Sequence, residues 1–397
     1  MTADNILGKD DRPRFFAVGN AAALGIEAPE PRLGVAVRSY VRSLAGMQKE
    51  ALIVSSATNS AWRLSCDEGP YLAGYDEAPF PLAFMGAGMV ASYFTEIAAL
   101  AERRGAALDG LRLVLDNRYT MEGSALRGTM VGGALAPELT VALDGDATGV
   151  DLPGLCADAL SASPLHGLLR EQLASLFTAT CQGLPLSVGR VAALDVPPPP
   201  DPAGRFDEVT VGGPGNAAEL ITRTAAAQLH EGEGGQGSSL QAEQKRTLHV
   251  RAACTARPDG IRDIEVSLFK PSGSSFHFLS DEPEGRRAPR APDAATLVAA
   301  GIGFCFMTQF GRYAAITRKQ LDGYRTVQDT HFSAGGASGG SGRAGRADPV
   351  ETHVYLDTPE GEDFARTLVD MGEQTCFLHA LCRTELRPAL RIQPAAR

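Results

Sequence analysis

The sequence predicts an α+β protein built from two similar halves in tandem. Three observations support this: strand-like runs alternate with two long apolar helical runs, the same order of elements occurs twice, and the composition is that of a globular chain. The chain has 397 residues, 44% of them hydrophobic and 21% charged, so a sizeable core is expected. Because a domain typically takes about 100–200 residues, two domains is the simplest organisation.

The first half follows an N-terminal extension assigned to residues 1–48, and its domain is assigned to residues 49–186. Strand-like residues come first, a long apolar helix follows, and two more strands lead to a last helix that carries the sequence SPLHGLLR. The expected strands are 50–56, 62–65, 111–119 and 139–143, and the expected long helix is 81–104.

Residues 187–246 are assigned to a linker, because PPPPDP and GGPG cannot continue a helix or a central strand. One helix is expected within it, over residues 217–229. The second domain, residues 247–397, repeats the order of the first. Its expected strands are 248–254, 264–269, 276–279, 324–332 and 351–356, and its expected long helix is 296–322. The Gly/Ser-rich residues 333–347 have no large apolar side chain, so we expect a mobile, dispensable loop.

The two halves share residues at nearly constant spacing. Gly86 aligns with Gly301, and Val90 with Cys305, at an offset of 215 residues. Downstream, SPLHGLLR aligns with CFLHALCR at an offset of 213, which places Ser163 opposite Cys376. Two matches in the same order indicate an internal duplication.

Composition excludes several classes of function. The net charge of −10 argues against non-specific nucleic-acid binding, which needs a basic surface. Residues 1–13 lack the apolar segment of a secretory signal, and no uninterrupted apolar run reaches about 18 residues, so no membrane span is expected. Seven cysteines without a CxxC pair suggest reduced thiols in the cytoplasm rather than a disulfide framework. The absence of GxGxxG, P-loop and HExxH motifs leaves no expectation of a cofactor or a metal.

Cys305 is the leading candidate for chemistry. A lone buried cysteine is usually structural, but here a later helix carries two more thiols, Cys376 and Cys382, with His379 between them and Arg383 nearby. A reactive thiol needs a nearby cation, and a second thiol lets a sulfenic acid collapse to a disulfide. His379 could instead be a buried structural residue, a proton donor, or one ligand of a metal site for which no fourth ligand is visible.

These residues resemble the OsmC/Ohr family of organic-hydroperoxide peroxidases. The segment APDAATLVAAGIGFCF resembles the family's reactive-cysteine helix, and CFLHAL resembles the start of its second-cysteine helix. The resemblance implies that Cys305 is the peroxidatic cysteine and Cys376 the resolving one. It also implies a strongly bent antiparallel sheet around a long central helix in each half, and a tandem chain that forms an intramolecular pseudo-dimer, with further oligomerisation possible.

The chain departs from the family pattern at several positions. Ala295 stands where family members often carry a Glu ten residues before the reactive cysteine, and Asp293 lies two residues earlier. Phe377 replaces the proline that follows the second cysteine. In the first half, Val90 and Ser163 occupy the two cysteine positions, so that half should be silent in thiol chemistry. The catalytic arginine is not identified by a motif, and the candidates are Arg251, Arg257, Arg262 and Arg290 in the second half and Arg63, Arg103 and Arg118 in the first.

The leading hypothesis is an antioxidant, thiol-dependent peroxidase that reduces a small apolar hydroperoxide through Cys305 and is reset by an external dithiol. Two rivals remain. One is altered chemistry on the same scaffold, hydrolysis or C–C cleavage of a bulky aromatic or apolar substrate, for which His379 would be the new catalytic group. The other is a ligand-binding protein without catalysis.

Overall fold

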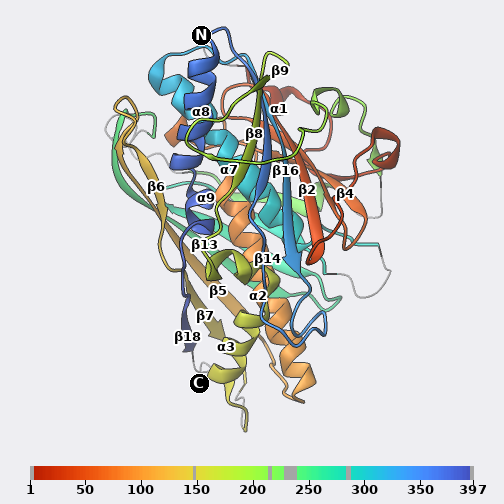
Figure 1. The fold of residues 1–397 in the computed structure, drawn as a ribbon. Helices are drawn as coiled ribbons and strands as arrows, with labels where there is room; N and C mark the ends of the chain where they lie inside the picture. Colours follow the sequence, from red (N-terminus) through yellow and green to blue (C-terminus); the bar gives the residue numbers. More distant parts are fainter. Residues whose placement is uncertain (1–3, 146–148, 213–216, 228–238, 283–287, 394–397) are drawn as a thin grey trace.

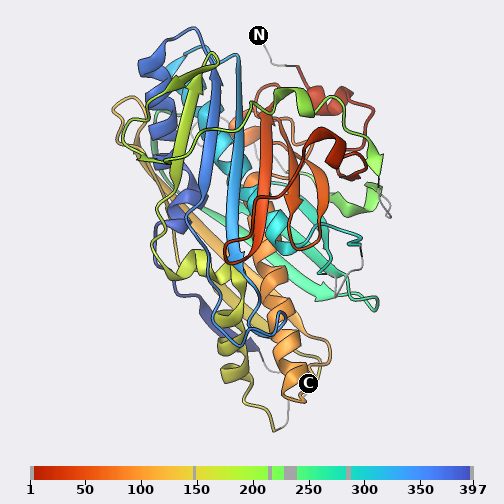
Figure 2. The same ribbon diagram turned by 45° about the vertical axis from the view of Figure 1, so that its right-hand side comes forward.

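The computed structural model describes residues 4–145, 149–212, 217–227, 239–282 and 288–393. Within these residues, strands form two large sheets, and two long helices lie between them (Figures 1 and 2). The α+β class predicted from the sequence is confirmed.

The first sheet contains strands from both ends of the chain. Its strands are β1 (Phe16–Val18), β2 (Gly34–Ser43), β3 (Lys49–Ser55), β4 (Ser60–Cys66), β8 (Leu176–Cys181), β9 (Leu184–Leu186), β10 (Ala192–Ala193), β11 (Val211–Gly212), β16 (Gly323–Ser333) and β17 (Glu351–Asp357). They run in the order β10-β8-β17-β16-β2-β3-β4-β1-β11, with β9 paired to β8. The join between the halves is the antiparallel pair β16–β2, which runs from Arg325 opposite Arg42 to Ser333 opposite Gly34.

The second sheet is built in the same way with the halves exchanged. Its strands are β5 (Arg112–Ser124), β6 (Val131–Ala134), β7 (Glu138–Ala142), β12 (Ile221–Ala225), β13 (Glu243–Ala256), β14 (Arg262–Lys270), β15 (Ser275–Ser280) and β18 (Ala389–Gln393). They run in the order β12-β15-β14-β13-β5-β7-β18, with β6 paired to β5. Here β5 of the first half pairs with β13 of the second. Each sheet therefore needs strands from both halves.

The core helices are α2 (Pro81–Arg103) and α7 (Ala294–Thr317). Pro81 suits the first helical position of α2, and the Asp293 carboxylate caps α7 by accepting a hydrogen bond from the Thr296 N–H at 2.6 Å. Helix α7 packs on β2, β3 and β16 of the first sheet, whereas α2 packs on β5, β13 and β14 of the second. The layers are thus sheet, α7, α2, sheet. The remaining helices are α1 (Ile6–Lys9), α3 (Leu152–Ala162), α4 (Gly167–Arg170), α5 (Ala217–Leu220), α8 (Glu362–Thr375) and α9 (Phe377–Cys382).

Two glycines let α2 and α7 approach each other closely. A Cβ atom on Gly88 would lie 2.6 Å from the carbonyl oxygen of Ala294, and one on Gly301 would lie 2.9 Å from the amide nitrogen of Met85. Both helices are long and apolar enough to span a bilayer by length and composition, but 83% and 89% of their most apolar windows are buried inside the protein. Core helices of globular proteins pass the same test, so the absence of a membrane span stays a prediction.

Several boundaries differ from those expected from the sequence. The strand β2 lies inside the expected N-terminal extension, and β13 begins inside the expected linker. The linker helix expected over 217–229 is one turn, α5, followed by β12; residues 228–229 lie outside the described residues. Helix α7 ends at Thr317 rather than at residue 322, because Arg318 adopts a left-handed conformation with φ of +56°.

The Gly/Ser-rich loop 333–347 is anchored, contrary to the expected mobility. The buried Glu96 carboxylate of α2 accepts hydrogen bonds from the Ala337 N–H at 2.8 Å and the Ser338 N–H at 3.3 Å. The side chain of Ala337 is buried, and Ala347 forms a β-bridge with Phe332. A polar side chain from another element supplies the anchor that the loop's own composition lacks.

Candidate functional site

The structure brings Cys305 and Cys376 together. Cys305 lies in the fourth turn of α7, and Cys376 lies at the junction between α8 and α9. Their side chains are hydrogen-bonded to each other, both thiols are free, and the Leu378 N–H donates a hydrogen bond to the Cys305 sulfur. The two thiols that the sequence pattern singled out are thus in direct contact.

The electrostatics at Cys305 differ from those expected. Burial raises the pKa of the Cys305 thiol well above its usual value, and the hydrogen bond with Cys376 raises it further. The negative charge of Glu68 acts in the same direction. We had expected a neighbouring arginine to lower this pKa; in the structure, burial outweighs any cation, and Cys305 is a protonated thiol.

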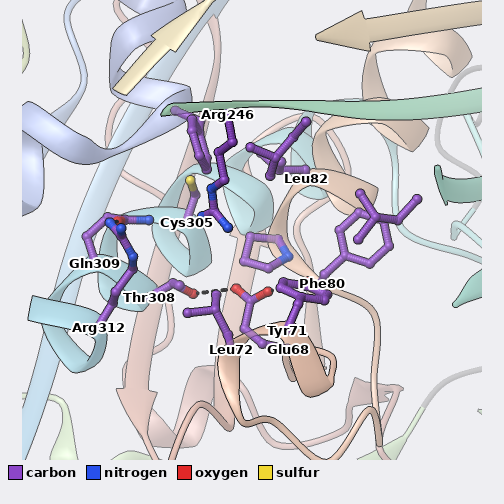
Figure 3. Close-up of a pocket in the computed structure, with 14 residues that line it drawn as sticks. Glu68, Tyr71, Leu72, Phe80, Leu82, Arg246, Cys305, Thr308, Gln309 and Arg312 are labelled. Atoms are coloured by element: carbon purple, nitrogen blue, oxygen red, sulfur yellow. Dashed lines mark hydrogen bonds between the residues drawn. The ribbon is translucent and has the colours of Figure 1, made fainter. Parts of the chain in front are cut away.

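Cys305 faces a small cavity of about 30 Å³. Figure 3 shows its lining residues, which come from both halves of the chain. The first half contributes Glu68, Tyr71, Leu72, Phe80, Pro81 and Leu82, and the second contributes Arg246, Leu248, Leu268, Cys305, Thr308, Gln309, Arg312 and Phe377. The cavity is mainly apolar, and its polar groups are one thiol, one carboxylate, two guanidinium groups and a few neutral donors. This composition is typical of a small-molecule site.

Two arginines, the buried Arg312 and the half-buried Arg246, line the cavity without a carboxylate partner among the described residues. Arg312 donates to the carbonyl oxygen of Ser239 at 2.7 Å and to Gln309 Oε1 at 3.3 Å, and its other contacts are to methionine sulfurs. Burial and the nearby charge of Arg246 lower the pKa of Arg312 to about 9. Arg246 donates to Ser239 Oγ, and its buried Nε has no hydrogen-bond partner in the part of the chain that the structure describes. Figure 3 shows its guanidinium reaching between Cys305 and Glu68.

Glu68 is the carboxylate of the cavity. It lies in the loop after β4 and accepts hydrogen bonds from the Thr308 hydroxyl at 2.8 Å and the Tyr71 hydroxyl at 2.7 Å. Burial raises the pKa of Glu68, and the buried ammonium of Lys49 opposes that shift. Because Thr308 lies one turn after Cys305 on α7, this hydrogen bond ties the first half's loop to the helix that carries Cys305.

Three predicted accessory residues are near the thiols but do not line the cavity. His379 is buried between the rings of Phe177 and Phe306, neither ring nitrogen has a hydrogen-bond partner among the described residues, and burial lowers its pKa to about 4. Burial raises the pKa of Cys382 to about 12. Arg383 is held in an ion pair with Glu373 at 2.6 Å. None of the three has the exposure to the cavity that catalysis requires.

The other predicted residues lie elsewhere. Asp293 caps α7, and together with Ala295 and Arg262 it lines a second cavity near α2. Arg290 forms ion pairs with Asp259 and Asp281. The remaining arginine candidates do not line the cysteine cavity. Arg103 lines the second cavity. The other four form ion pairs: Arg251 with Asp116, Arg257 with Asp263, Arg63 with Glu50 and Arg118 with Glu138.

The first-half counterpart of Cys305 is Ser92 rather than Val90. The Ser92 hydroxyl lies 2.8 Å from the Ser163 hydroxyl, just as Cys305 contacts Cys376. The contacts at the helix crossing give the same register: Gly88 approaches Ala294 and Gly301 approaches Pro81, and both 301 minus 88 and 294 minus 81 equal 213. The sequence alignment was two residues out of register because it matched Gly86 with Gly301.

The charged residues of the cavity that the sequence reasoning missed are Glu68, Arg246 and Arg312. Glu68 lies in LSCDEGPY, a segment already set beside LSDEPEG of the second half, so a repeated acidic block could have identified it. Arg312 stands in an apolar helix, where an unexplained charge is itself a signal. Arg246 carries no motif. Among the described residues, no cluster of three or more metal-ligating side chains is found.

Comparison with known proteins adds little to this geometry. No protein-family model and no curated protein matches the chain. One solved structure, an OsmC-like hydroperoxide resistance protein from Jannaschia sp. CCS1, is 18% identical over a match that covers 33% of this chain and 81% of that one, with a TM-score of 0.19. A TM-score this low does not establish that the two proteins share a family.

Proposed function

We propose that the protein is a thiol-dependent peroxidase that reduces small organic hydroperoxides through Cys305, with Cys376 as the resolving cysteine. The observation that carries this proposal is the contact between the two free thiols at an apolar cavity that also holds two arginines without carboxylate partners. A buried cation without an acid partner is costly to maintain, so a function that uses its charge is the simplest reason to keep it.

The reaction balances with these groups alone and one external reductant. The Cys305 sulfur attacks the distal peroxide oxygen, the O–O bond breaks, and the thiol proton goes to the departing alkoxide, which leaves as an alcohol. Cys305 is then a sulfenic acid. The Cys376 sulfur attacks it, water leaves, and a Cys305–Cys376 disulfide forms. An external dithiol reduces that disulfide by exchange and is itself oxidised.

The surrounding side chains have defined parts in this scheme. Arg246 and Arg312 stabilise the negative charge that develops on sulfur and on the leaving oxygen. Glu68, fixed by Thr308 and Tyr71, accepts hydrogen bonds at one side of the same cavity and orients the peroxide. The apolar wall of Leu72, Phe80 and Leu82 suits a hydrocarbon substituent. A cavity of about 30 Å³ favours a small hydroperoxide over a bulky one.

We also propose that the fold is a fused pseudo-dimer of two OsmC-like halves, with the thiols kept in one half only. The mirrored strand orders of the two sheets and the common 213-residue offset support this. Reduced thiols support a cytoplasmic location. Hydrolysis or C–C cleavage is less well supported, since His379 does not face the cavity and is neutral.

The test is to treat the reduced protein with one equivalent of a small alkyl hydroperoxide, tert-butyl hydroperoxide, and to map the cysteines by mass spectrometry. We expect a Cys305–Cys376 disulfide and consumption of the peroxide. Cys305→Ser should abolish both, whereas Cys376→Ser should consume one equivalent and stop at oxidised Cys305. Cys254→Ser, on β13 and away from the cavity, is the matched control. A free Cys305 with unconsumed peroxide would sink the proposal, and a Cys305–Cys382 bridge would overturn the assignment of Cys376.

A further inference from the structure

A second cavity lies beside α2, and it is much larger than the cysteine cavity. Its volume is about 660 Å³, against about 30 Å³ at Cys305. Small-molecule sites in proteins typically measure about 300–1,000 Å³. We call it the serine cavity, because Ser92 is among its lining residues and the buried Ser163 is bonded to Ser92.

The serine cavity occupies the place in the first half that the cysteine cavity occupies in the second. Ser92, Thr95 and Pro164 line it, and each stands 213 residues before a residue of the cysteine cavity, namely Cys305, Thr308 and Phe377. Neither serine can form a thiolate or a disulfide. The two serines therefore cannot perform thiol chemistry in this cavity, but the cavity still has space for a ligand.

One wall of the serine cavity is a loop that hydrogen bonds hold in place. Residues 333–339 form one side, and the buried Glu96 carboxylate holds that loop through the Ala337 and Ser338 N–H groups. Without this anchor a glycine-rich segment would gain little by staying ordered. An interior carboxylate that shapes an empty space is the arrangement expected of a binding site.

The charged groups inside the cavity favour a cation. The described charged residues that line it are three carboxylates, the exposed Glu102 with Glu282 and Asp293, and two guanidinium groups, the exposed Arg103 and Arg262. Arg262 is already engaged: it donates to Thr95 Oγ1 at 3.3 Å and to the Gly260 carbonyl at 2.9 Å, and its guanidinium lies 4.7 Å from the centre of the Phe94 ring. Glu282 accepts a hydrogen bond from the Ala294 N–H at 2.6 Å, and Asp293 accepts one from the Thr296 N–H at 2.6 Å.

The charge of Asp293 acts on Glu282. Burial raises the pKa of Glu282 to about 7, and the charge of Asp293 adds to that shift, whereas the Ala294 N–H and the charge of Arg262 oppose it. A positive group placed between them would remove the repulsion and replace lost hydration. Around them, Val35, Leu165 and Phe332 supply apolar surface for the rest of a ligand.

We propose that the serine cavity binds a small organic amine with an apolar body, whose ammonium group lies at Glu282 and Asp293. This site is separate from the thiol site, so the inference does not depend on the peroxidase proposal. The pair of cavities would then divide two tasks, with redox chemistry at Cys305 and amine binding at Ser92.

The experiment uses three ligands of one shape and different charge: phenethylamine, phenethyl alcohol and phenylacetate. Isothermal titration calorimetry on the whole protein should show binding of the amine and at least about tenfold weaker binding of the other two. Glu282→Gln and Asp293→Asn should each weaken the amine by about tenfold or more. Asn keeps the cap of α7, so a loss in that variant reports charge rather than a broken helix end.

Two controls separate the outcomes. Glu122→Gln removes an exposed carboxylate of β5 outside the cavity and should leave amine binding unchanged. Cys305→Ser should also leave amine binding unchanged, so the amine proposal is tested independently of the thiol chemistry. Ala98→Phe, which fills the cavity from α2, should abolish it. Equal affinity for phenylacetate, amine binding that survives Glu282→Gln, or no binding of any of the three would overturn the proposal.

Discussion

Arg312 is a buried guanidinium whose hydrogen-bond partners among the described residues are neutral: a carbonyl, an amide oxygen and two thioethers. Its charge is poorly compensated, as its pKa, lowered to about 9, shows. Arg383 is similar in type but has a carboxylate partner, Glu373. The two residues thus allow function and stability to be separated by matched substitutions.

We predict that Arg312→Met lowers the rate of peroxide consumption by about 100-fold, because charge stabilisation of the leaving oxygen is lost. The same substitution should raise the free energy of unfolding by about 1–3 kcal/mol, because an uncompensated buried charge is removed. Arg383→Met should do the opposite, leaving the rate nearly unchanged and lowering stability. Stopped-flow peroxide assays and urea denaturation measure the two quantities. A loss of stability in Arg312→Met equal to that in Arg383→Met would show that Arg312 is structural.

At this scale the sequence identified the two thiols but not their neighbours. Cys305 and Cys376 lie in short sequence segments, APDAATLVAAGIGFCF and CFLHAL, that resemble a known family. Glu68, Arg246 and Arg312 come from a loop, a strand and a helix, and they meet only because both halves build one cavity. No local spacing encodes such a meeting, so the accessory residues were sought beside the two cysteines and among arginines without a motif. His379 proved to be buried, Arg383 and Arg290 are paired with carboxylates, and Asp293 and Arg262 line the second cavity.

At the scale of elements, the crossing of α2 and α7 determines how the two cavities are arranged. Both helices and the nine strands expected from the sequence lie close to observed elements, because their apolar runs are long, but nine further strands of the described residues were not expected. The alignment of one half with the other was not predicted correctly. Each long helix carries two glycines, and the sequence alone does not say which of them meet at the helix crossing. The structure shows that Gly88 and Gly301 are the glycines at the crossing.

We predict that Gly88→Ala and Gly301→Ala each lower the free energy of unfolding by about 1–3 kcal/mol, because the new methyl group would press on the backbone of the facing helix. Alanine normally favours a helix over glycine, so the sign of this effect is diagnostic. Gly204→Ala, which would meet no atom within 4 Å, is the control and should change little. Chemical denaturation measures all three. A stabilised Gly88→Ala variant would mean that the helices do not cross there.

At the scale of the whole molecule, the halves exchange strands. The first sheet joins β2 to β16 and the second joins β13 to β5, so neither half owns a complete sheet. The sequence predicted tandem domains with boundaries at residues 49, 187 and 247. Pairing between distant strands cannot be read from local patterns, which is why β2 and the start of β13 were assigned to connecting segments.

We predict that a chain cut between residues 227 and 239 stays assembled, because the paired strands hold the pieces together. The two pieces, 1–227 and 239–397, should co-purify when expressed together and should be insoluble when expressed alone, since each would expose unpaired strand edges. Size-exclusion chromatography after affinity capture of one tagged piece measures this. Two independently folded, monomeric pieces would contradict the strand exchange.

Both cavities are built from a single chain, and this has an evolutionary consequence. In an assembly of two identical subunits, every inherited change appears at both sites, so neither can lose its chemistry while the other keeps it. Here the codons for Ser92 and Cys305 are separate, and selection can act on each alone. If the two halves arose by duplication, as we propose, one cavity could lose its thiols, enlarge and acquire acidic groups without any loss at the other. A second role could arise within one gene, with no need for a second copy.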